Sequence, residues 1–316
     1  MKTIVTGCAG FIGSNLVDHL LTKGHEVVGI DNLSTGKKVF LEEALSNEKF
    51  KFIEEDILSC NNLSEIFNGA EIVYHFSANA DVRFGLENTQ RDLDQNTVAT
   101  YRILEAMKKS EIKKIVFSST GSVYGESKLI PTPEDYSFPI QTSLYAASKV
   151  AAESLITSFC YGFNMQCWIF RFVSILGPRY SHGHVYDFYK KLMINQNKLE
   201  VLGNGKQKKS YLHIYDCISA IEVAIKEASG SINIFNLGTE EYCEVNDSIA
   251  WITNELGYKP QLEYSGGDRG WIGDNPFIFL DVKKIKKLGW SPKYSIKEGV
   301  LSTLRYLQSN DWLFEK

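Results

Sequence analysis

The sequence predicts an α/β protein in which helices cover both faces of a parallel sheet and a smaller mixed lobe follows. Strand-like and helix-like segments alternate through the first half of the 316-residue chain, a pattern typical of a parallel sheet. A β-rich run at residues 3–6 leads through three glycines into a helical pattern. After residue 177, glycine, proline and aromatic residues become frequent. We therefore expect one domain over residues 1–176 and a second lobe over residues 177–316.

The individual elements follow from the spacing of apolar residues. Residues 13–23, for example, place Leu16, Val17, Leu20 and Leu21 on one side of a helix. The other expected helices span residues 93–109, 145–159, 186–194, 246–256 and 283–290. The expected strands span residues 3–6, 26–30, 51–53, 72–76, 115–119, 166–173 and 232–237. We expect the last of these strands to return to the main sheet.

Composition excludes several classes of protein. The formal net charge of −4 argues against a nucleic-acid partner, which usually needs a basic surface. No run of about 18 apolar residues is present to span a membrane. The six cysteines form no C-x-x-C pair, so we expect free thiols in a reducing cytoplasm. His182 and His184 have no third ligand nearby in the sequence, so we expect no metal.

The most informative stretch is the glycine-rich turn after the first strand. Gly7, Gly10 and Gly13 follow the spacing G-x-x-G-x-x-G between a strand and a helix. Glycines allow a tight turn and a close approach of the backbone to a pyrophosphate. The helix that follows presents N–H groups and the positive end of its dipole to phosphates. A loop without a ligand is the alternative for the glycine pattern alone.

An acid follows the second strand, where dinucleotide-binding proteins hold a ribose. Asp31 lies 18 residues after Gly13, and its carboxylate would accept hydrogen bonds from the ribose hydroxyls. The same charge would repel the 2′-phosphate of NADP, so we favour NAD. The alternative is an ordinary turn residue. Asp56, after the third strand, is expected either to contact the adenine or to cap local structure.

A tyrosine and a lysine four residues apart form the catalytic candidate. Tyr145 and Lys149 share one face of a helix. A phenol with a pKa of about 10 is a poor base at neutral pH, but an ammonium and a positive nicotinamide ring would lower that pKa. Tyr145 could then take a proton from a sugar hydroxyl. The hydroxyls of residues 118–120, 25 residues before Tyr145, could bind the same oxygen. An ordinary amphipathic helix is the alternative.

Taken together, these motifs resemble the extended short-chain dehydrogenase/reductase family, in its sugar-nucleotide epimerase/dehydratase branch, and are closest to UDP-glucose 4-epimerase-like members. The resemblance covers nearly the whole chain. It rests on residues 6–13, 31–36, 75–82, 96, 118–125, 145–149, 171–179, 203–216 and 288–292. It implies a Rossmann domain with tightly held NAD, a C-terminal lobe that grips a nucleotide diphosphate sugar, and a homodimer formed by helices 93–109 and 145–159.

The resemblance also assigns residues to the cofactor and to catalysis. The catalytic trio carries over as Thr120, Tyr145 and Lys149. The cofactor residues implied are Gly7, Gly10, Phe11, Ile12, Gly13, Asp31, Asn32, Ser34, Thr35, Gly36, Asp56, Ile57, Phe76, Ser77, Ala78, Asn96, Ser118, Tyr145, Lys149 and Phe172. The substrate residues implied are Arg83, Thr120, Ser122, Tyr145, Ser174, Arg179, Lys209 and Arg269. A solvated surface charge is the alternative for Lys209 and Arg269.

The residues after Thr120 narrow the reaction. The 4,6-dehydratases of this branch carry Asp and Glu there, and its decarboxylating members place Glu where Ser122 stands; this chain has Gly121 and Ser122. Dehydration and decarboxylation are therefore disfavoured, which leaves redox chemistry at one carbon, C4. We expect a 4-epimerase, with a 4-dehydrogenase that releases a keto-sugar as the alternative. A non-enzymatic dinucleotide sensor is a third reading.

The substrate lobe departs from the usual pattern at two positions. Ser174 stands where many epimerases have Asn, and Lys209 stands where they have Arg. A lysine binds phosphate as a point charge without the bidentate fork of arginine. These changes leave the sugar open, and the base could be uridine, guanosine or cytidine.

Overall fold

The computed structural model describes residues 1–79, 84–137, 139–269 and 277–315. The chain forms two compact units, and it passes between them several times. Unit 1 comprises residues 1–125, 139–171 and 221–235, and unit 2 comprises residues 126–138, 172–220 and 236–316. The single boundary after residue 176 expected from the sequence is therefore too simple, because contacts group residues 126–138 with unit 2 and residues 221–235 with unit 1.

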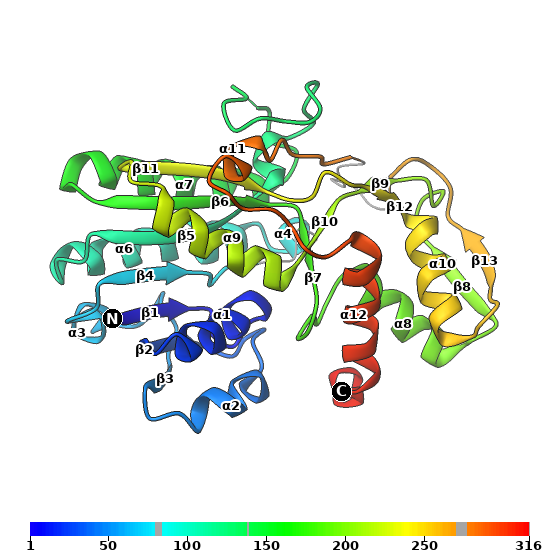
Figure 1. Cartoon of the computed structure of the whole chain (residues 1–316), viewed down its shortest axis with the longest axis horizontal. Helices are drawn as coiled ribbons and strands as arrows, with labels where there is room; N and C mark the ends of the chain where they lie inside the picture. Colours follow the sequence, from blue (N-terminus) through cyan, green and yellow to red (C-terminus); the bar gives the residue numbers. More distant parts are fainter. Residues whose placement is uncertain (80–83, 138, 270–276, 316) are drawn as a thin grey trace. The chain divides into compact units, whose positions relative to one another are not determined.

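A seven-stranded sheet forms the centre of unit 1, in the order β11-β6-β5-β4-β1-β2-β3 (Figure 1). Its strands are β1 (Lys2–Thr6), β2 (Glu26–Asp31), β3 (Phe50–Glu54), β4 (Ile72–His75), β5 (Lys114–Thr120), β6 (Gln166–Phe172) and β11 (Ile232–Leu237). The strands from β3 to β5 run parallel. Thr6 pairs with Ile30 on one side and with His75 on the other. The loops after these strands therefore gather at one edge of the sheet, where ligands of such folds bind.

Helices cover both faces of this sheet. They are α1 (Phe11–Thr22), α2 (Glu42–Leu45), α3 (Leu63–Phe67), α4 (Phe84–Glu87), α5 (Thr89–Asp92), α6 (Ala99–Lys109), α7 (Leu144–Phe163) and α9 (Ile214–Glu227). On one face, Ile4, Ile115 and Ile169 pack into a core shared with α3, α6 and α7. Elsewhere, α1 meets α9 through His19 and Glu222, whose side chains lie 3.2 Å apart. Successive side chains of a strand point to opposite faces of the sheet, so each strand contributes to the packing on both faces.

One expected helix is interrupted. The sequence predicts a continuous helix over residues 93–109, but Leu93–Val98 is a π-helical turn and α6 begins only at Ala99. Such turns occur frequently at functional sites, and this one holds the buried Asn96. Helix α7 follows the prediction more closely. Ser143 caps it by accepting a hydrogen bond from the Ala146 N–H, which fixes the start of the helix one residue before Tyr145.

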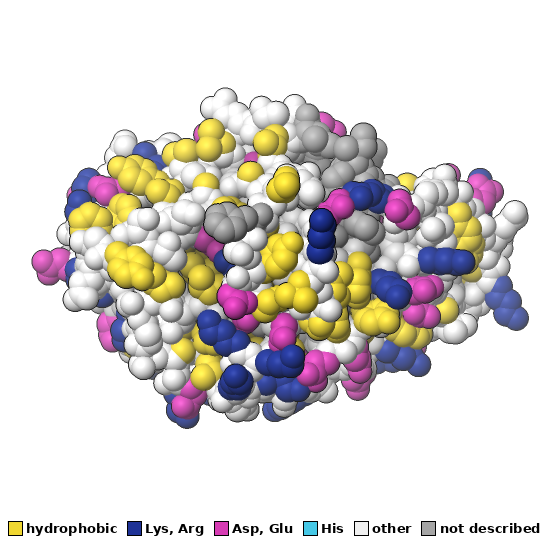
Figure 2. Space-filling view, turned by 90° about the horizontal axis from the view of Figure 1, so that it is seen from above, with side chains coloured by type: hydrophobic (Ala, Val, Ile, Leu, Met, Phe, Trp, Pro, Cys, Tyr) yellow, Lys and Arg dark blue, Asp and Glu magenta, His cyan; other side chains and the backbone are white. Residues whose placement is uncertain are grey.

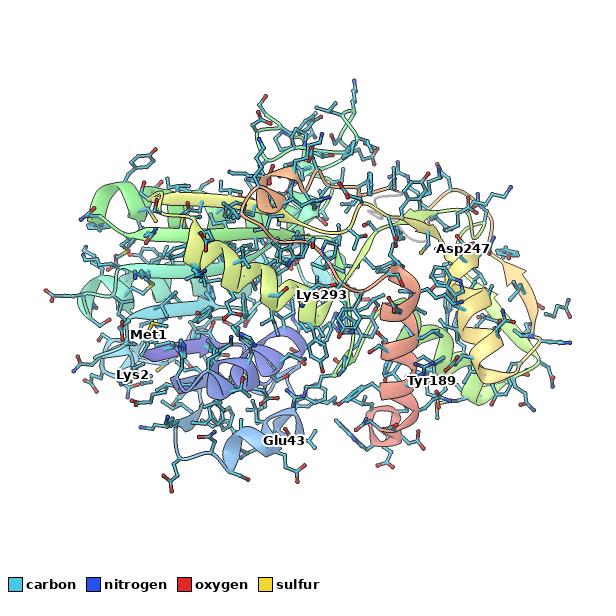
Figure 3. The ribbon with its side chains drawn as sticks, in the orientation of Figure 1. Met1, Lys2, Glu43, Tyr189, Asp247 and Lys293 are labelled. Carbon is cyan, nitrogen blue, oxygen red and sulfur yellow. The ribbon has the colours of Figure 1, made fainter. Side chains whose placement is uncertain are left out.

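In its described residues, unit 2 contains three two-stranded sheets and four α-helices. Its elements are β7 (Ser174–Leu176), α8 (His184–Ile194), β8 (Lys198–Val201), β9 (Lys208–Lys209), β10 (Tyr211–His213), β12 (Cys243–Glu244), α10 (Val245–Leu256), β13 (Gln261–Tyr264), α11 (Lys283–Lys286) and α12 (Ile296–Gln308). The pairs β7–β10 and β8–β13 are parallel, and β9–β12 is antiparallel. Helices α8, α10 and α12 pack together. Figure 3 labels Tyr189 on α8 and Asp247 in the first turn of α10.

Two helices of unit 2 differ from the prediction. The helix expected over residues 283–290 is only one turn long, because Lys283–Lys286 ends before the left-handed Gly289, whose φ is +90°. Helix α12 was not predicted, although Ser295 and Glu298 form a capping box at its start. Throughout the described ranges, every helix is too short or too polar to cross a bilayer.

Candidate active site

The glycine-rich turn lies against the end of β4. Gly7 has a φ of +69°, and its N–H donates to the Ile30 carbonyl at 2.9 Å. A side chain at position 7 would place its Cβ 2.6 Å from the Ser77 nitrogen and 2.8 Å from the Phe76 carbonyl carbon. Only glycine therefore allows this loop and the loop after β4 to approach so closely. The Gly10 N–H closes the turn by donating to the Gly7 carbonyl at 3.1 Å.

The first turn of α1 is packed just as tightly. A Cβ on Gly13 would collide with the Gly7 carbonyl, and a Cβ on Gly36 would lie 2.9 Å from Asp31 Oδ1 and 3.0 Å from Ala9. Among the described residues, no side chain caps the start of α1 at Phe11. Backbone rather than side chains therefore surrounds the start of this helix, which is the cradle that a pyrophosphate requires. The cradle fits the predicted NAD, and Phe11, Ile12 and Gly13 stay candidates for contacting it.

Asp31 links the glycine loop to the loop after β2. Its Oδ2 accepts the Ala9 N–H at 2.9 Å, and its Oδ1 accepts the Leu33 N–H at 2.8 Å. Burial raises the pKa of Asp31, while these two backbone N–H groups oppose the rise. Each carboxylate oxygen has a further lone pair, so the carboxylate retains acceptor capacity for a ribose hydroxyl. The loop of Ser34, Thr35 and Gly36 follows directly.

Asp56 organises its own turn. Its Oδ1 accepts the Leu58 N–H at 2.8 Å, and its Oδ2 accepts Asn32 Nδ2 at 2.9 Å. Of the two roles that the sequence left open, these contacts correspond to the cap, and contact with an adenine stays a prediction. Ile57, beside it, is buried, and its carbonyl accepts Arg102 Nε at 2.7 Å.

The loop after β4 is tied to the catalytic helix through Asn96. Asn96 Oδ1 accepts the Asn79 N–H at 2.9 Å, and Asn96 Nδ2 donates to Ser148 Oγ at 2.9 Å. Ser148 Oγ in turn donates to the Tyr145 carbonyl at 2.7 Å. Asn96 thus positions the segment of Phe76, Ser77 and Ala78 relative to α7. Its predicted contact with the cofactor remains a prediction.

The three predicted catalytic residues come together in unit 1. The side chains of Thr120 and Tyr145 share a hydrogen bond. Lys149, which is 2% exposed, donates from Nζ to the Ser118 carbonyl at 2.9 Å and lies 4.7 Å from the centre of the Phe117 ring. Strand β5 and helix α7 therefore present a hydroxyl, a phenol and an amine at one end of the sheet.

Burial governs the electrostatics of this group. Burial raises the pKa of Tyr145 to about 12, against the opposing hydrogen bond from Thr120, and the Asp92 carboxylate adds to the rise. Burial lowers the pKa of Lys149 to about 7, although Glu153 and Asp92 both act to raise it. The sequence predicted that Lys149 and a nicotinamide together lower the pKa of Tyr145. In the protein alone desolvation raises the pKa of Tyr145, and the lowering expected with a nicotinamide bound stays a prediction.

Ser122 lies in the turn that follows the strand end. The Thr120 side chain accepts the Ser122 N–H at 3.1 Å and donates to Ser122 Oγ at 3.2 Å. Gly121 precedes Ser122, so the positions next to Thr120 in this turn carry no acid. The hydroxyls of Thr120 and Ser122 are thus neighbours in unit 1, as a shared contact with one substrate oxygen requires.

The substrate candidates of unit 2 fall into separate environments. Ser174 is exposed at the start of β7, opposite Tyr211 of β10. Lys209 lies on β9, and together with burial its charge lowers the pKa of His184 to about 3. His184 shares a hydrogen bond with Ser248 Oγ at 2.8 Å. Lys209 therefore lies near a neutral, buried imidazole.

The arginine candidates are more scattered. Arg269 Nη1 forms an ion pair with Glu126 Oε1 at 2.7 Å. Arg179, whose φ is +72°, is near enough to α12 for its charge to act on Tyr306. Phe172, assigned to the cofactor, is buried at the end of β6. Arg83 lies outside the described residues.

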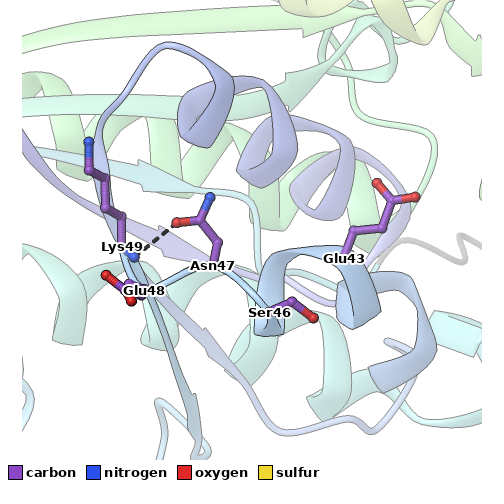
Figure 4. Close-up of a pocket in the computed structure, with 5 residues that line it drawn as sticks. All are labelled: Glu43, Ser46, Asn47, Glu48 and Lys49. Carbon is purple, nitrogen blue, oxygen red and sulfur yellow. Dashed lines mark hydrogen bonds between the residues drawn. The ribbon is translucent and has the colours of Figure 1, made fainter.

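Sequence reasoning missed a buried ion pair directly behind Lys149. Glu153 and Arg171 are 2.7 Å apart, and Glu153 also accepts a hydrogen bond from Ser119 Oγ. A signal was available, because Tyr145, Lys149 and Glu153 follow at intervals of four residues and so share one helix face. A separate hollow on unit 1, drawn in Figure 4, is lined by Glu43, Ser46, Asn47, Glu48 and Lys49 and includes none of the predicted site residues.

Comparison with known proteins agrees with this geometry. The model of the "NAD dependent epimerase/dehydratase family" matches residues 3–238. A putative UDP-glucose 4-epimerase of Methanocaldococcus jannaschii is 33% identical over 98% of this chain and 99% of that protein. The crystal structure of the Thermotoga maritima UDP-glucose 4-epimerase with UDP-glucose has a TM-score of 0.88 at 32% identity, covering 98% of this chain and 99% of that one.

A third relative carries both ligands. The UDP-glucuronic acid 4-epimerase of Bacillus cereus, in complex with UDP-glucuronic acid and NAD, has a TM-score of 0.90 at 29% identity, covering 98% of this chain and 99% of that one. These similarities confirm the α/β fold class, the family resemblance, NAD as the cofactor and the sugar-nucleotide epimerase activity expected from the sequence. The roles of individual site residues stay predictions.

Proposed function

The chain belongs to the NAD dependent epimerase/dehydratase family, and we propose that it inverts C4 of the sugar in a UDP-sugar. The observation that carries this proposal is the Thr120–Tyr145–Lys149 group, which lies beside a turn with no carboxylate at Gly121 or Ser122. Water elimination requires an acid and a base in that turn. Beyond NAD as the hydride acceptor, redox chemistry at one carbon requires from the protein only a proton acceptor, a hydroxyl to hold the oxygen and a positive charge.

Each residue of the group has a defined task. Tyr145 accepts the proton of the C4 hydroxyl as that carbon is oxidised, and it returns the proton to the oxygen on reduction. Thr120 shares its hydrogen bond between Tyr145 and the same sugar oxygen. Lys149 is the positive charge of the group, which favours the phenolate form of Tyr145. Because the phenol of the protein alone has a pKa of about 12, Lys149 by itself does not make Tyr145 a base at neutral pH.

When bound, NAD would supply the acceptor and donor of the hydride that C4 loses and regains. We assign the closely packed Gly7, Gly10 and Gly13 to its pyrophosphate, and Asp31, whose carboxylate accepts the Ala9 N–H, to a ribose. A carboxylate at that point favours NAD over NADP, since the 2′-phosphate would lie against a negative charge.

Two observations support a uridine diphosphate as part of the substrate: the names of the relatives and the positively charged side chains of unit 2. The three relatives described above are all named for UDP-sugars. Lys209 and Arg269 are positively charged side chains of unit 2 that we assign to the diphosphate, with Arg179 as a further candidate. Ser174 is shorter than the Asn that is usual there, and we propose that it allows a bulkier or charged sugar than glucose.

We also propose a homodimer formed through helices α6 and α7. Both helices expose apolar side chains in unit 1, including Tyr101 at 47%, Tyr161 at 82% and Phe163 at 37%. Contiguous apolar surface of this kind commonly marks an interface. Hydrophobic side chains reach the surface in several places on the face seen in Figure 2.

The predicted cytoplasmic location agrees with six cysteines that are free and buried.

A product assay tests the proposed function. The purified chain, without added cofactor, is incubated with UDP-glucose, UDP-N-acetylglucosamine and UDP-glucuronic acid, and products are identified by proton NMR while NADH absorbance is followed. A 4-epimer without a lasting absorbance change is the expected result. A lasting rise with a ketone would instead establish the dehydrogenase, and no conversion of any sugar would refute both. Tyr145→Phe should abolish conversion, whereas the exposed Tyr215→Phe should not.

A further inference from the structure

Behind the catalytic group lies a buried polar cluster that the proposed reaction does not use. It consists of Ser119, Tyr124, Glu153 and Arg171, all in unit 1. Ser119 Oγ donates to Glu153 Oε1. Arg171 grips the same carboxylate through Nε at 3.1 Å and Nη2 at 2.7 Å, and its Nη1 donates to the Tyr124 hydroxyl at 2.8 Å. This cluster joins the end of β5, helix α7 and the end of β6.

The helix register connects this cluster to the catalytic residues. Tyr145, Lys149 and Glu153 are successive members of one i, i+4, i+8 row on α7, so their side chains lie along the same face. Ser119 is likewise the neighbour of Thr120 on β5. Glu153 therefore holds the strand residue next to Thr120, while its own helix carries Tyr145. The hydrogen bond between Thr120 and Tyr145 also joins β5 to α7, one residue further along the strand.

We propose that Glu153 is a positioning residue for the Tyr145–Lys149 pair, which fixes the end of β5 against α7 through Ser119 and supplies the negative charge behind Lys149. Arg171 and Tyr124 hold that carboxylate in place. The expected effect of Glu153 on Lys149 follows from the contacts within unit 1 alone. Its expected effect on catalysis rests on the proposed function.

The charge argument follows from what surrounds Lys149. Glu153 faces it from α7, Asp92 from α5, and the buried His75 from β4. Burial keeps His75 neutral, because it lowers the pKa of that imidazole to about 3. Desolvation lowers the pKa of Lys149 to about 7, and the two carboxylates are the groups that oppose this fall. Without the charge of Glu153, Lys149 would be mostly neutral at pH 7.

A purely structural role of the Glu153–Arg171 ion pair is the competing explanation, and suitable variants separate it from a positioning role. A buried ion pair contributes little net stability compared with apolar residues of similar volume. Removing Glu153 alone, however, leaves Arg171 buried without its carboxylate, and that variant is expected to fold poorly. The double variant E153Q/R171M removes both charges and avoids that cost. Ser119→Ala removes only the hydroxyl bridge and leaves the charge in place.

The test measures NADH affinity against pH by fluorescence for the wild type, E153Q, E153Q/R171M, S119A and the control E222Q. Glu222 pairs with Lys23 on the surface and contributes nothing to the charge felt by Lys149. NADH is an anion, so its affinity for the protein falls as pH rises through the pKa of Lys149. The variant K149M should show no such fall, which identifies Lys149 as the group whose titration gives the midpoint. We expect that midpoint to move about one pH unit lower in E153Q/R171M, and in E153Q where it folds.

Turnover of whichever UDP-sugar the wild type converts in the product assay gives the second readout. S119A should keep the wild-type midpoint but lower kcat about tenfold with little change in KM, because it loosens Thr120 relative to Tyr145. Midpoints of E153Q/R171M and E222Q that both equal the wild-type value would overturn the charge argument. Unchanged kcat in S119A would overturn the positioning argument. If the midpoint moves while the wild type converts no UDP-sugar, the proposed function fails and the charge argument stands.

Discussion

Replacing Gly7 by alanine tests the cofactor cradle most directly, and Gly69 provides a matched control. Both glycines lie in unit 1 in the left-handed region, with φ values of +69° and +76°. A Cβ at position 7 would lie 2.6 Å from the Ser77 nitrogen, whereas a Cβ at position 69 would meet nothing within 4 Å. The two variants therefore share the backbone strain and differ only in the overlap.

The magnitude follows from these distances. A left-handed alanine costs about 1 kcal/mol or somewhat more, and Gly69→Ala should lose only that. Carbon atoms normally approach to about 3.5–4.0 Å, so the Cβ of Gly7→Ala would intrude by about 1 Å on backbone atoms that cannot rotate away. Such overpacking typically adds about 1–3 kcal/mol. We therefore expect Gly7→Ala to lose about 2–4 kcal/mol.

Urea unfolding followed by far-UV circular dichroism measures the two losses, and NADH fluorescence measures binding. The unfolding midpoint of Gly7→Ala should fall well below that of Gly69→Ala, since the slope with urea is set by the surface exposed and should be shared. NADH affinity should drop more than about tenfold in Gly7→Ala, equivalent to over about 1.4 kcal/mol, and stay at the wild-type value in Gly69→Ala. Equal midpoints and equal affinities in the two variants would refute the cradle.

Three further predictions concern charge. Asp31→Asn should shift the ratio of NAD to NADP affinity towards NADP by about tenfold, and an unchanged ratio would contradict the assigned role of Asp31. Folded His75 has its pKa lowered to about 3 by burial, whereas the unfolded chain takes up this proton below about pH 6.5; stability should therefore fall as pH drops below 6.5, and the slope of the urea midpoint with pH should be shallower in His75→Gln. Lys209→Met should weaken UDP binding measured by calorimetry, and Lys209→Arg should retain it; equal losses in both would argue against a phosphate contact.

The parts of the site that sequence predicted are those in which residue identity dictates local backbone or helix register. At Gly7 and Gly13 a Cβ would strike backbone, so the glycine spacing, with the strand before it and the helix after it, located the tight turn. Tyr145 and Lys149 lie four residues apart on a helix, so their shared face needed no tertiary information. The parallel sheet also followed from the alternation of elements, because parallel strands need crossover connections, whereas the order of its strands was not predicted.

What could not be predicted depends on contacts between residues distant in the sequence. Asn96 bonds Asn79 and Ser148 from within a π-helical turn, and apolar periodicity carries no signal for either feature. Asp56 caps its own turn and accepts from Asn32, a choice that spacing left open. The crossings of the chain between the two units likewise depend on which segments pack together, so no single boundary in the sequence marks them.

The same distinction explains why the sequence did not predict that burial raises the pKa of Tyr145 in the protein alone. Sequence shows which charges are near in register, and so it shows Lys149 but not the burial that raises the phenol to about pKa 12 and lowers the amine to about 7. With Lys149 buried and Tyr145 half-buried, we expect each charge to depend on its neighbour in the row: the phenolate on Lys149, and Lys149 on Glu153. A carboxylate two helical turns from Tyr145, held by Arg171, therefore belongs to the same electrostatic unit as the residue that moves the proton.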